Sequence, residues 1–194
     1  EGGSITVDGD GTLITTEQCL LNANRNPGWT RDEIEDELRE QLGVSKIIWL
    51  RWGRLEDRHT DGHVDVVCMF VRPGAVIVQG CDDPANSNYQ RMQSNLKTLR
   101  AATDARGRAL QIIELPLLPL VEVCGEQVLV GNTNFYFANN GIVVPVTDEA
   151  TGDGVLETFR RACPTHQVVA VRARMIGFGG GGIHCITQQI PAGT

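Results

Sequence analysis

The chain has 194 residues, of which 41% are hydrophobic and 21% are charged, a composition typical of a soluble globular domain with a substantial core. No apolar run is long enough to span a membrane. The net charge of -7 argues against nucleic acid as the main partner, because phosphate binding requires a basic face, and it is compatible with a small cationic substrate.

The first predicted elements follow one another as strand, strand, helix and strand. Residues 4–16 alternate apolar and polar side chains around a D-G-D-G turn, which indicates a β-hairpin. Residues 30–43 form a helix that begins with a capping box at Thr30 and ends at a glycine. Its predicted apolar face consists of Ile34, Leu38 and Leu42. Residues 44–50 are predicted to be a buried strand.

The same order of elements recurs twice along the chain. Hairpins with a Pro-Gly turn and an Asn-Gly turn are each followed by an amphipathic helix and an apolar strand. The repeats are predicted to span approximately residues 1–50, 63–115 and 132–171 of one partial domain, 1–194. Residues 177–194 form a closing segment that looks like the start of another hairpin.

A ββαβ unit cannot bury its sheet alone, but several copies arranged around an axis can share a core. We therefore predict a radial array of units with the helices outside. Glu1 and His63 occupy equivalent positions before the turn glycines of their hairpins, and Cys185 opens the next predicted strand. These three residues, far apart in sequence, are expected to converge on the axis.

The residue types at this convergence suit attack on a cationic carbon. His63 and Asp65 are two positions apart, so on a strand their side chains share one face. An imidazole beside a carboxylate can act as general acid and base, and a cysteine beside an imidazolium becomes a nucleophile. Glu1 adds a second carboxylate that could hold substrate N–H groups. The glycines of residues 179–182 would let the backbone approach a substrate closely.

Other interpretations remain open for the same residues. Cys185 taken alone is compatible with a buried packing residue, and Glu1 with a frayed terminus. The i, i+4 spacing of His59 and His63 is found in zinc sites on helices, but the residues around them favour a loop followed by a strand, so no metal is expected. His184 is expected to be structural.

The cysteines indicate the cellular compartment, and the first residues indicate whether the chain is a fragment. None of the six cysteines forms a C-x-x-C pair, which favours scattered reduced thiols in a cytoplasmic protein. The chain starts on "EGGSITV" without a methionine or a visible signal peptide, so we expect a fragment of a longer protein.

Motifs along the whole chain resemble one family, the agmatine deiminases and bacterial peptidylarginine deiminases of the guanidine-modifying (pentein) superfamily. The motifs are "EGGSI", "TTEQCLLNANRNP", "TDGHVD", "FVRPG", "NFYFANNGIVVP" and "GGGGIHCITQQIP". The resemblance implies an α/β fold, a propeller of five ββαβ repeats of which this chain holds about three. It implies no metal and no organic cofactor.

The resemblance also assigns roles to residues. It implies that Cys185 is the nucleophile, that His63 is the acid and base, and that Asp65 and Glu1 hold the substrate. Three further residues are expected in the substrate pocket, namely Asp57, Gly181 and Gly182. Family members are nearly twice as long, and a further guanidinium-binding aspartate has no match here, so the fragment alone is expected to be inactive.

The activity that the resemblance implies is hydrolysis of agmatine to N-carbamoylputrescine and ammonia through a thiouronium intermediate, a step of polyamine biosynthesis. Two alternatives stay open. One is a peptidylarginine deiminase, an arginine deiminase or an amidinotransferase of the same superfamily. The other is a non-catalytic propeller fragment that acts as a binding module. A homo-oligomer is compatible with the sequence, and neither nucleic acid nor membrane is expected as a partner.

Overall fold

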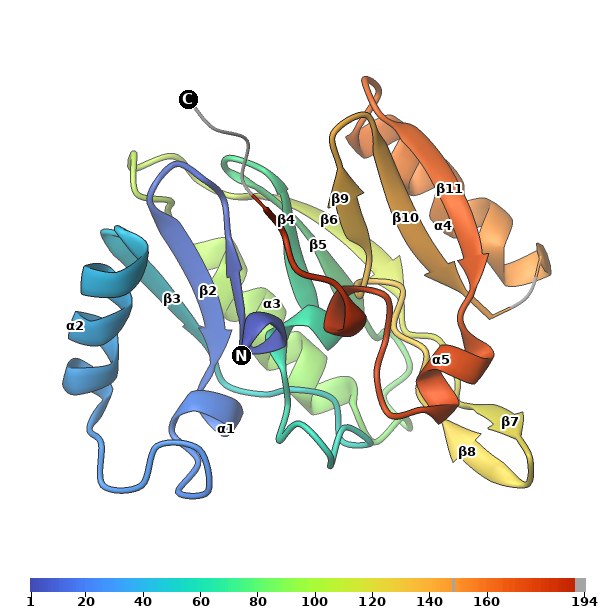
Figure 1. The fold of residues 1–194 in the computed structure, drawn as a ribbon, viewed down its shortest axis with the longest axis horizontal. Helices are drawn as coiled ribbons and strands as arrows, with labels where there is room; N and C mark the ends of the chain where they lie inside the picture. The colour runs from blue at the N-terminus through green and yellow to red at the C-terminus, as the bar shows by residue number, and fades with distance from the viewer. Residues whose placement is uncertain (148, 191–194) are drawn as a thin grey trace. The chain divides into compact units, whose positions relative to one another are not determined.

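A computed structural model describes residues 1–147 and 149–190 (Figure 1). The contacts divide the chain into two compact units. The first comprises Glu1 and Gly3–Leu117, and the second comprises Gly2 and the residues from Leu118 onward. Among the described helices, none is both long and apolar enough to cross a membrane.

The first repeat of the first unit is a three-stranded sheet with one long helix. Its elements are η1 (Gly2–Ser4), β1 (Ile5–Val7), β2 (Thr12–Thr16), α1 (Glu17–Leu20), α2 (Arg31–Leu42) and β3 (Lys46–Leu50). Strand β2 lies in the middle, antiparallel to β1 and parallel to β3. The Asp8 carboxylate accepts the backbone N–H groups of Asp10 and Thr12, which explains why D-G-D-G turns the chain here.

The second repeat has the same order. Its elements are η2 (Val64–Val66), β4 (Cys68–Arg72), β5 (Ala75–Gly80), α3 (Tyr89–Ala101) and β6 (Gln111–Pro116). Strand β5 lies between antiparallel β4 and parallel β6. A hydrogen bond from the Phe70 backbone N–H to Thr6 Oγ1, 3.2 Å long, connects the two repeats within this unit.

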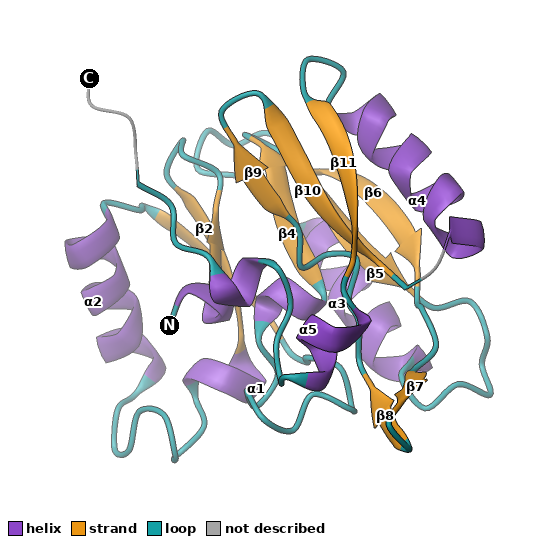
Figure 2. Ribbon diagram, turned by 45° about the vertical axis from the view of Figure 1, so that its right-hand side comes forward, coloured by secondary structure: helices purple, strands orange, loops and turns teal. Residues whose placement is uncertain are grey.

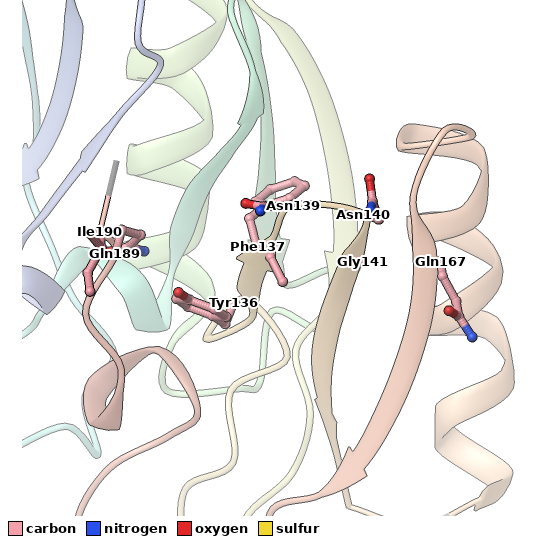
Figure 3. Close-up of a pocket in the computed structure, with 9 residues that line it drawn as sticks. Tyr136, Phe137, Asn139, Asn140, Gly141, Gln167, Gln189 and Ile190 are labelled. Atoms are coloured by element: carbon pink, nitrogen blue, oxygen red, sulfur yellow. The ribbon is translucent and has the colours of Figure 1, made fainter. Parts of the chain in front are cut away.

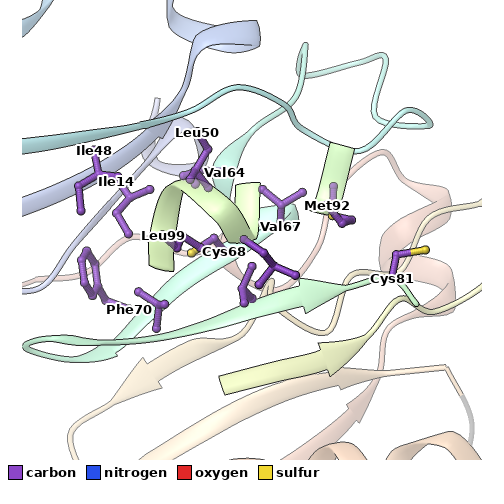
Figure 4. Close-up of a cluster of buried hydrophobic side chains, with 13 residues drawn as sticks. Ile14, Ile48, Leu50, Val64, Val67, Cys68, Phe70, Cys81, Met92 and Leu99 are labelled. Carbon is purple, nitrogen blue, oxygen red and sulfur yellow. The ribbon is translucent and has the colours of Figure 1, made fainter. Parts of the chain in front are cut away.

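The two repeats of the first unit share one apolar core (Figure 4). Ile14 and Leu50 from the first repeat pack with Val76 and Met92 from the second, and all four are fully buried. Burying a side chain of this size contributes about 1.5–3 kcal/mol. Because neither sheet could bury this surface alone, the shared core holds together the loops that carry His63 and Asp65.

The second unit begins with a small hairpin and contains the third repeat (Figure 2). Its elements are β7 (Val121–Val123), β8 (Glu126–Val128), β9 (Tyr136–Ala138), β10 (Gly141–Val146), α4 (Glu149–Ala162), β11 (Gln167–Arg172), α5 (Arg174–Phe178) and η3 (His184–Ile186). Strand β10 lies between antiparallel β9 and parallel β11. Phe135 packs edge-to-face on Phe159, with ring centroids 4.9 Å apart, so it joins the sheet to α4.

These elements confirm the predicted α/β class built from ββαβ repeats, since the order recurs in both units. The closure of the repeats into a ring stays a prediction.

Some local predictions are wrong. The described part of the closing segment forms the helical turns α5 and η3 instead of a hairpin. The predicted apolar face of α2 is only partly buried, because Ile34 is buried but Leu42 is 45% exposed.

Candidate active site

His63 is held in a buried position at the start of η2. It precedes Val64–Val66 as the N-cap residue, so it does not lie on a strand as predicted, and only 8% of its surface is exposed. Its Nε2 lies 2.7 Å from Oε2 of Glu1. An ionised carboxylate can only accept a hydrogen bond, so Nε2 carries a proton in this pair.

Gly3 lets the backbone pass close to both His63 and Asp65. A Cβ atom at this position would lie 2.5 Å from Nδ1 of His63 and 2.6 Å from Oδ2 of Asp65, closer than nonbonded atoms approach. Asp65 is fully buried in η2. The first unit therefore brings the imidazole, the Asp65 carboxylate and Glu1 together, with a glycine as the only residue that fits between them.

Asp57 orders the loop that leads to His63. Its Oδ2 accepts the backbone N–H of His63 at 3.1 Å and the hydroxyl of Thr60 at 2.5 Å. Its Oδ1 accepts the backbone N–H of Thr60 at 3.3 Å. These contacts fix the backbone on which the imidazole is mounted, so they favour a positioning role. The place of Asp57 in a substrate pocket stays a prediction.

Arg25 is a residue that the sequence interpretation missed. Its guanidinium forms an ion pair with the Glu1 carboxylate, donates to the backbone oxygen of His59 at 3.5 Å, and lies 3.4 Å from Asp61. Partial burial raises the pKa of Glu1, but the hydrogen bond with His63 and the charge of Arg25 outweigh that effect, so the net pKa is lowered. The only sequence signal for Arg25 is its place in the motif "TTEQCLLNANRNP".

Cys19 completes a group that offers three kinds of ligand atom. Its thiol, the Glu1 carboxylate and a ring nitrogen of His63 all lie within 4.8 Å of one another. Sulfur, nitrogen and oxygen together suit a transition metal. However, the Arg25 guanidinium on Glu1 repels a dication, and burial raises the pKa of Cys19 to about 11. The same raised pKa makes Cys19 a poor nucleophile at neutral pH.

Cys185 lies in the second unit, in the turn η3, where it is exposed while its neighbour His184 is buried. The Asn134 side chain approaches this turn. Its Oδ1 accepts the backbone N–H of His184 at 2.9 Å and that of Cys185 at 3.4 Å, and its Nδ2 lies 3.3 Å from the Cys185 sulfur. Asn134 is the first residue of the motif "NFYFANNGIVVP", and nothing in its spacing predicts this contact.

The two glycines predicted in the substrate pocket pack against these residues. A Cβ atom at Gly181 would lie 3.1 Å from Cβ of Cys185. A Cβ atom at Gly182 would overlap the Asn134 amide, 2.5 Å from its Cγ. Neither has a positive φ, so close packing explains these glycines better than backbone strain does.

The second unit also contains a cavity of about 650 Å³ (Figure 3). Tyr136 and Asn139 line it from β9 and the following turn, Gln167 from β11, and Gln189 and Ile190 from the last described residues. None of the predicted site residues is among its lining residues. The cavity therefore does not identify the site.

The predicted site residues lie in two groups, one in each unit. Glu1, His63 and Asp65 lie together in the first unit, and the Asp57 carboxylate accepts a hydrogen bond from the His63 backbone N–H. Cys185 lies with Gly181 and Gly182 in the second unit. The convergence of Cys185 on His63 stays a prediction.

Known proteins share both the sequence and the fold of this chain. The sequence model of the Porphyromonas-type peptidyl-arginine deiminase family matches residues 1–191. The chain belongs to this family. Within it, the chain is 46% identical to an agmatine deiminase of Stutzerimonas stutzeri over 99% of its own length and 57% of that relative.

Solved structures of peptidyl-arginine deiminase relatives share the fold. The agmatine deiminase of Enterococcus faecalis superimposes with a TM-score of 0.90 at 34% identity, covering 98% of this chain and 57% of that one. A cysteine-to-serine variant of the C. jejuni agmatine deiminase with substrate bound gives a TM-score of 0.86 at 28% identity, covering 95% and 54%. The chain thus spans little more than half the length of the relatives that it matches.

Proposed function

We propose that the complete protein containing these residues hydrolyses the guanidinium group of agmatine. The observation that carries the chemistry is the buried His63 imidazole, hydrogen-bonded to Glu1 and adjacent to Asp65 across Gly3. An acid and base flanked by carboxylates suits a cationic planar substrate. The identity to an agmatine deiminase over nearly the whole chain supports agmatine as that substrate.

The proposed reaction uses Cys185 as the nucleophile. Its thiolate attacks the guanidinium carbon, and collapse of the tetrahedral adduct, with a proton from His63, releases ammonia and leaves a thiouronium on the sulfur. His63 then takes a proton from water, whose oxygen attacks the same carbon. The C–S bond breaks, the thiolate is restored and N-carbamoylputrescine leaves. The C. jejuni relative, whose cysteine-to-serine variant holds substrate, supports a cysteine in this role.

The carboxylates supply orientation and charge. Glu1 and Asp65 are proposed to bind substrate N–H groups, which places the carbon for attack. The lowered pKa of Glu1 keeps it ionised at neutral pH, where it can pair with a cation. We further propose that the protein acts in the cytoplasm, in polyamine biosynthesis, on a small guanidine and without a metal or organic cofactor.

A direct test compares the complete wild-type protein with Cys185→Ala and Cys124→Ala. Both cysteines are exposed, which makes Cys124 the matched control. Release of ammonia and ureido product from agmatine should vanish in Cys185→Ala and persist in Cys124→Ala. Turnover at the wild-type rate in Cys185→Ala would contradict the proposed role of Cys185, and no turnover in the complete wild-type protein would favour a non-catalytic binding module.

A second candidate substrate is arginine within a peptide, because the matching family model is described as peptidyl-arginine deiminase. Comparing kcat/KM for agmatine, free arginine and an arginine-containing peptide separates the candidates. A preference for agmatine supports the first proposal, and a preference for the peptide supports the second. Transfer of the amidino group to an added amine, with no ureido product, would instead indicate an amidinotransferase.

A further inference from the structure

The Asn134 amide touches both the backbone and the sulfur of the turn that carries Cys185. Its Oδ1 accepts the backbone N–H of His184 at 2.9 Å and that of Cys185 at 3.4 Å. Its Nδ2 lies 3.3 Å from the Cys185 sulfur. Asn134 precedes Cys185 by 51 residues, so this is a tertiary contact within the second unit.

The backbone donors determine which way the amide faces. An amide oxygen is an acceptor and an amide nitrogen is a donor, and only the oxygen can receive the two N–H groups of the turn. Both ends of the amide lie near the sulfur: Oδ1, 3.5 Å away, can accept from the S–H of a thiol, and the NH₂ group, 3.3 Å away, is the end that can donate to a thiolate. A thiolate accepts such a hydrogen bond strongly, because the acceptor carries a full charge.

The amide has little freedom to leave this position. Asn134 is only 2% exposed, its own N–H donates to the Gly131 carbonyl at 3.0 Å, and its carbonyl accepts the His184 N–H at 3.2 Å. The absence of a side chain at Gly182 makes room for the amide, since a Cβ atom there would overlap Oδ1. The donor is thus held in place before any substrate arrives.

We propose that Asn134 is a positioning residue for the nucleophile, which fixes the turn through Oδ1 and stabilises the Cys185 thiolate through Nδ2. The proposal rests on the function proposed above, in which Cys185 reacts as a thiolate. In this proposal Gly182 is needed because it leaves space for the Asn134 amide.

The test measures the pH dependence of iodoacetamide alkylation at Cys185, followed by peptide mass spectrometry. In Asn134→Ala the midpoint should rise by about one to two pH units, the shift that corresponds to losing one hydrogen bond to a charged group. Asn132→Ala is the matched control, because Asn132 is also fully buried in the same segment and its side-chain amide has no hydrogen-bond partner among the described residues. Its midpoint should equal that of the wild type.

Asn134→Asp separates the donor from the acceptor. It retains an oxygen for the two backbone N–H groups but replaces the NH₂ group with a second oxygen, so the turn is kept and the midpoint should rise at least as far as in Asn134→Ala. A wild-type midpoint in Asn134→Asp would overturn the proposal. It would show that Asn134 only holds the backbone of the turn, since aspartate can accept the same two N–H groups but cannot donate to the sulfur. The variant also serves if Asn134→Ala does not fold.

The two proposals fail in different ways. If Cys185→Ala abolishes turnover but neither Asn134 variant moves the alkylation midpoint, the role of Asn134 is wrong and the proposed function stands. If Cys185→Ala retains full turnover while the midpoint shifts, the contact stands and the proposed role of Cys185 as the nucleophile is wrong. In an active enzyme, the rise of kcat/KM with pH that follows ionisation of Cys185, separate from the loss in acid that follows protonation of Glu1, should shift in Asn134→Asp in parallel with alkylation, and an unshifted rise would contradict the proposal.

Discussion

Replacing Gly3 with alanine should disable the His63 site without disturbing the surrounding fold. The new Cβ atom would lie 2.5 Å from Nδ1 of His63 and 2.6 Å from Oδ2 of Asp65. Carbon atoms prefer contacts of about 3.5 Å, so the imidazole or the carboxylate must move by about 1 Å. Neither moves freely, because Asp65 is fully buried and His63 is held by Glu1 and by Asp57.

A displacement of that size has a calculable effect on catalysis. Moving a reacting group by about 1 Å costs about 100-fold in rate, and overpacking a filled site costs about 1–3 kcal/mol of stability. We therefore expect kcat/KM for agmatine to fall about 100-fold in Gly3→Ala of the complete protein, with folding retained by circular dichroism.

The neighbouring glycine provides the control for this prediction. A Cβ atom at Gly2 would meet no atom within 4 Å, so Gly2→Ala should keep wild-type activity. Wild-type kcat/KM in Gly3→Ala would refute the reasoning, because it would mean that the contacts around His63 and Asp65 do not constrain the reaction.

Three further predictions follow from the first unit. Arg25→Ala removes a cation that lowers the pKa of Glu1, so Glu1 should become protonated at a higher pH. The loss of kcat/KM in acid should then begin at a higher pH than in the wild type. An unchanged pH dependence in acid would exclude this role of Arg25. Thr30→Ala removes the capping box of α2 and should lower the free energy of unfolding in urea by about 1 kcal/mol, whereas no change would show that the cap is dispensable. Asp57→Ala removes three hydrogen bonds from the loop before His63 and should cost about 2–3 kcal/mol in the same assay, and a loss below 0.5 kcal/mol would contradict the proposed ordering of the loop.

The direction of the pH effect follows from the sign of the shift. The folded pKa of Glu1 lies below its ordinary value, so its ionised form stabilises the fold above the ordinary carboxyl pKa. That stabilisation is lost as pH falls through the lowered pKa. Without Arg25 the pKa moves back up, and the loss occurs sooner on acidification.

Short-range patterns in the sequence predicted most of the repeats. The turn at Asn140 and Gly141, the capping box at Thr30 and the helix ending at Gly43 each depend on residues within a few positions, and each is present. The β7–β8 hairpin was missed. Its strands have three residues each, and its turn places Cys124 at a φ of 53°, a conformation in which cysteine is not expected.

The remaining errors concern segments whose form depends on distant contacts. The glycine-rich closing segment has no hydrophobic period, and the backbone of η3 is held by Asn134, about 50 residues away. Arg25 reaches Glu1 across a separation of 24 residues in sequence, past the first hairpin and α1. Neither contact leaves a local pattern, so motif resemblance could point to these segments without specifying which atoms meet.

The most direct test of the central claim is mass spectrometry of the complete protein, quenched in acid during turnover of agmatine. If Cys185 is the nucleophile, a covalent adduct, agmatine less ammonia, should appear on the peptide that contains Cys185, and Cys185→Ala should release no ammonia. Ammonia release at the wild-type rate in Cys185→Ala, or an adduct on another cysteine such as Cys19, would contradict this role.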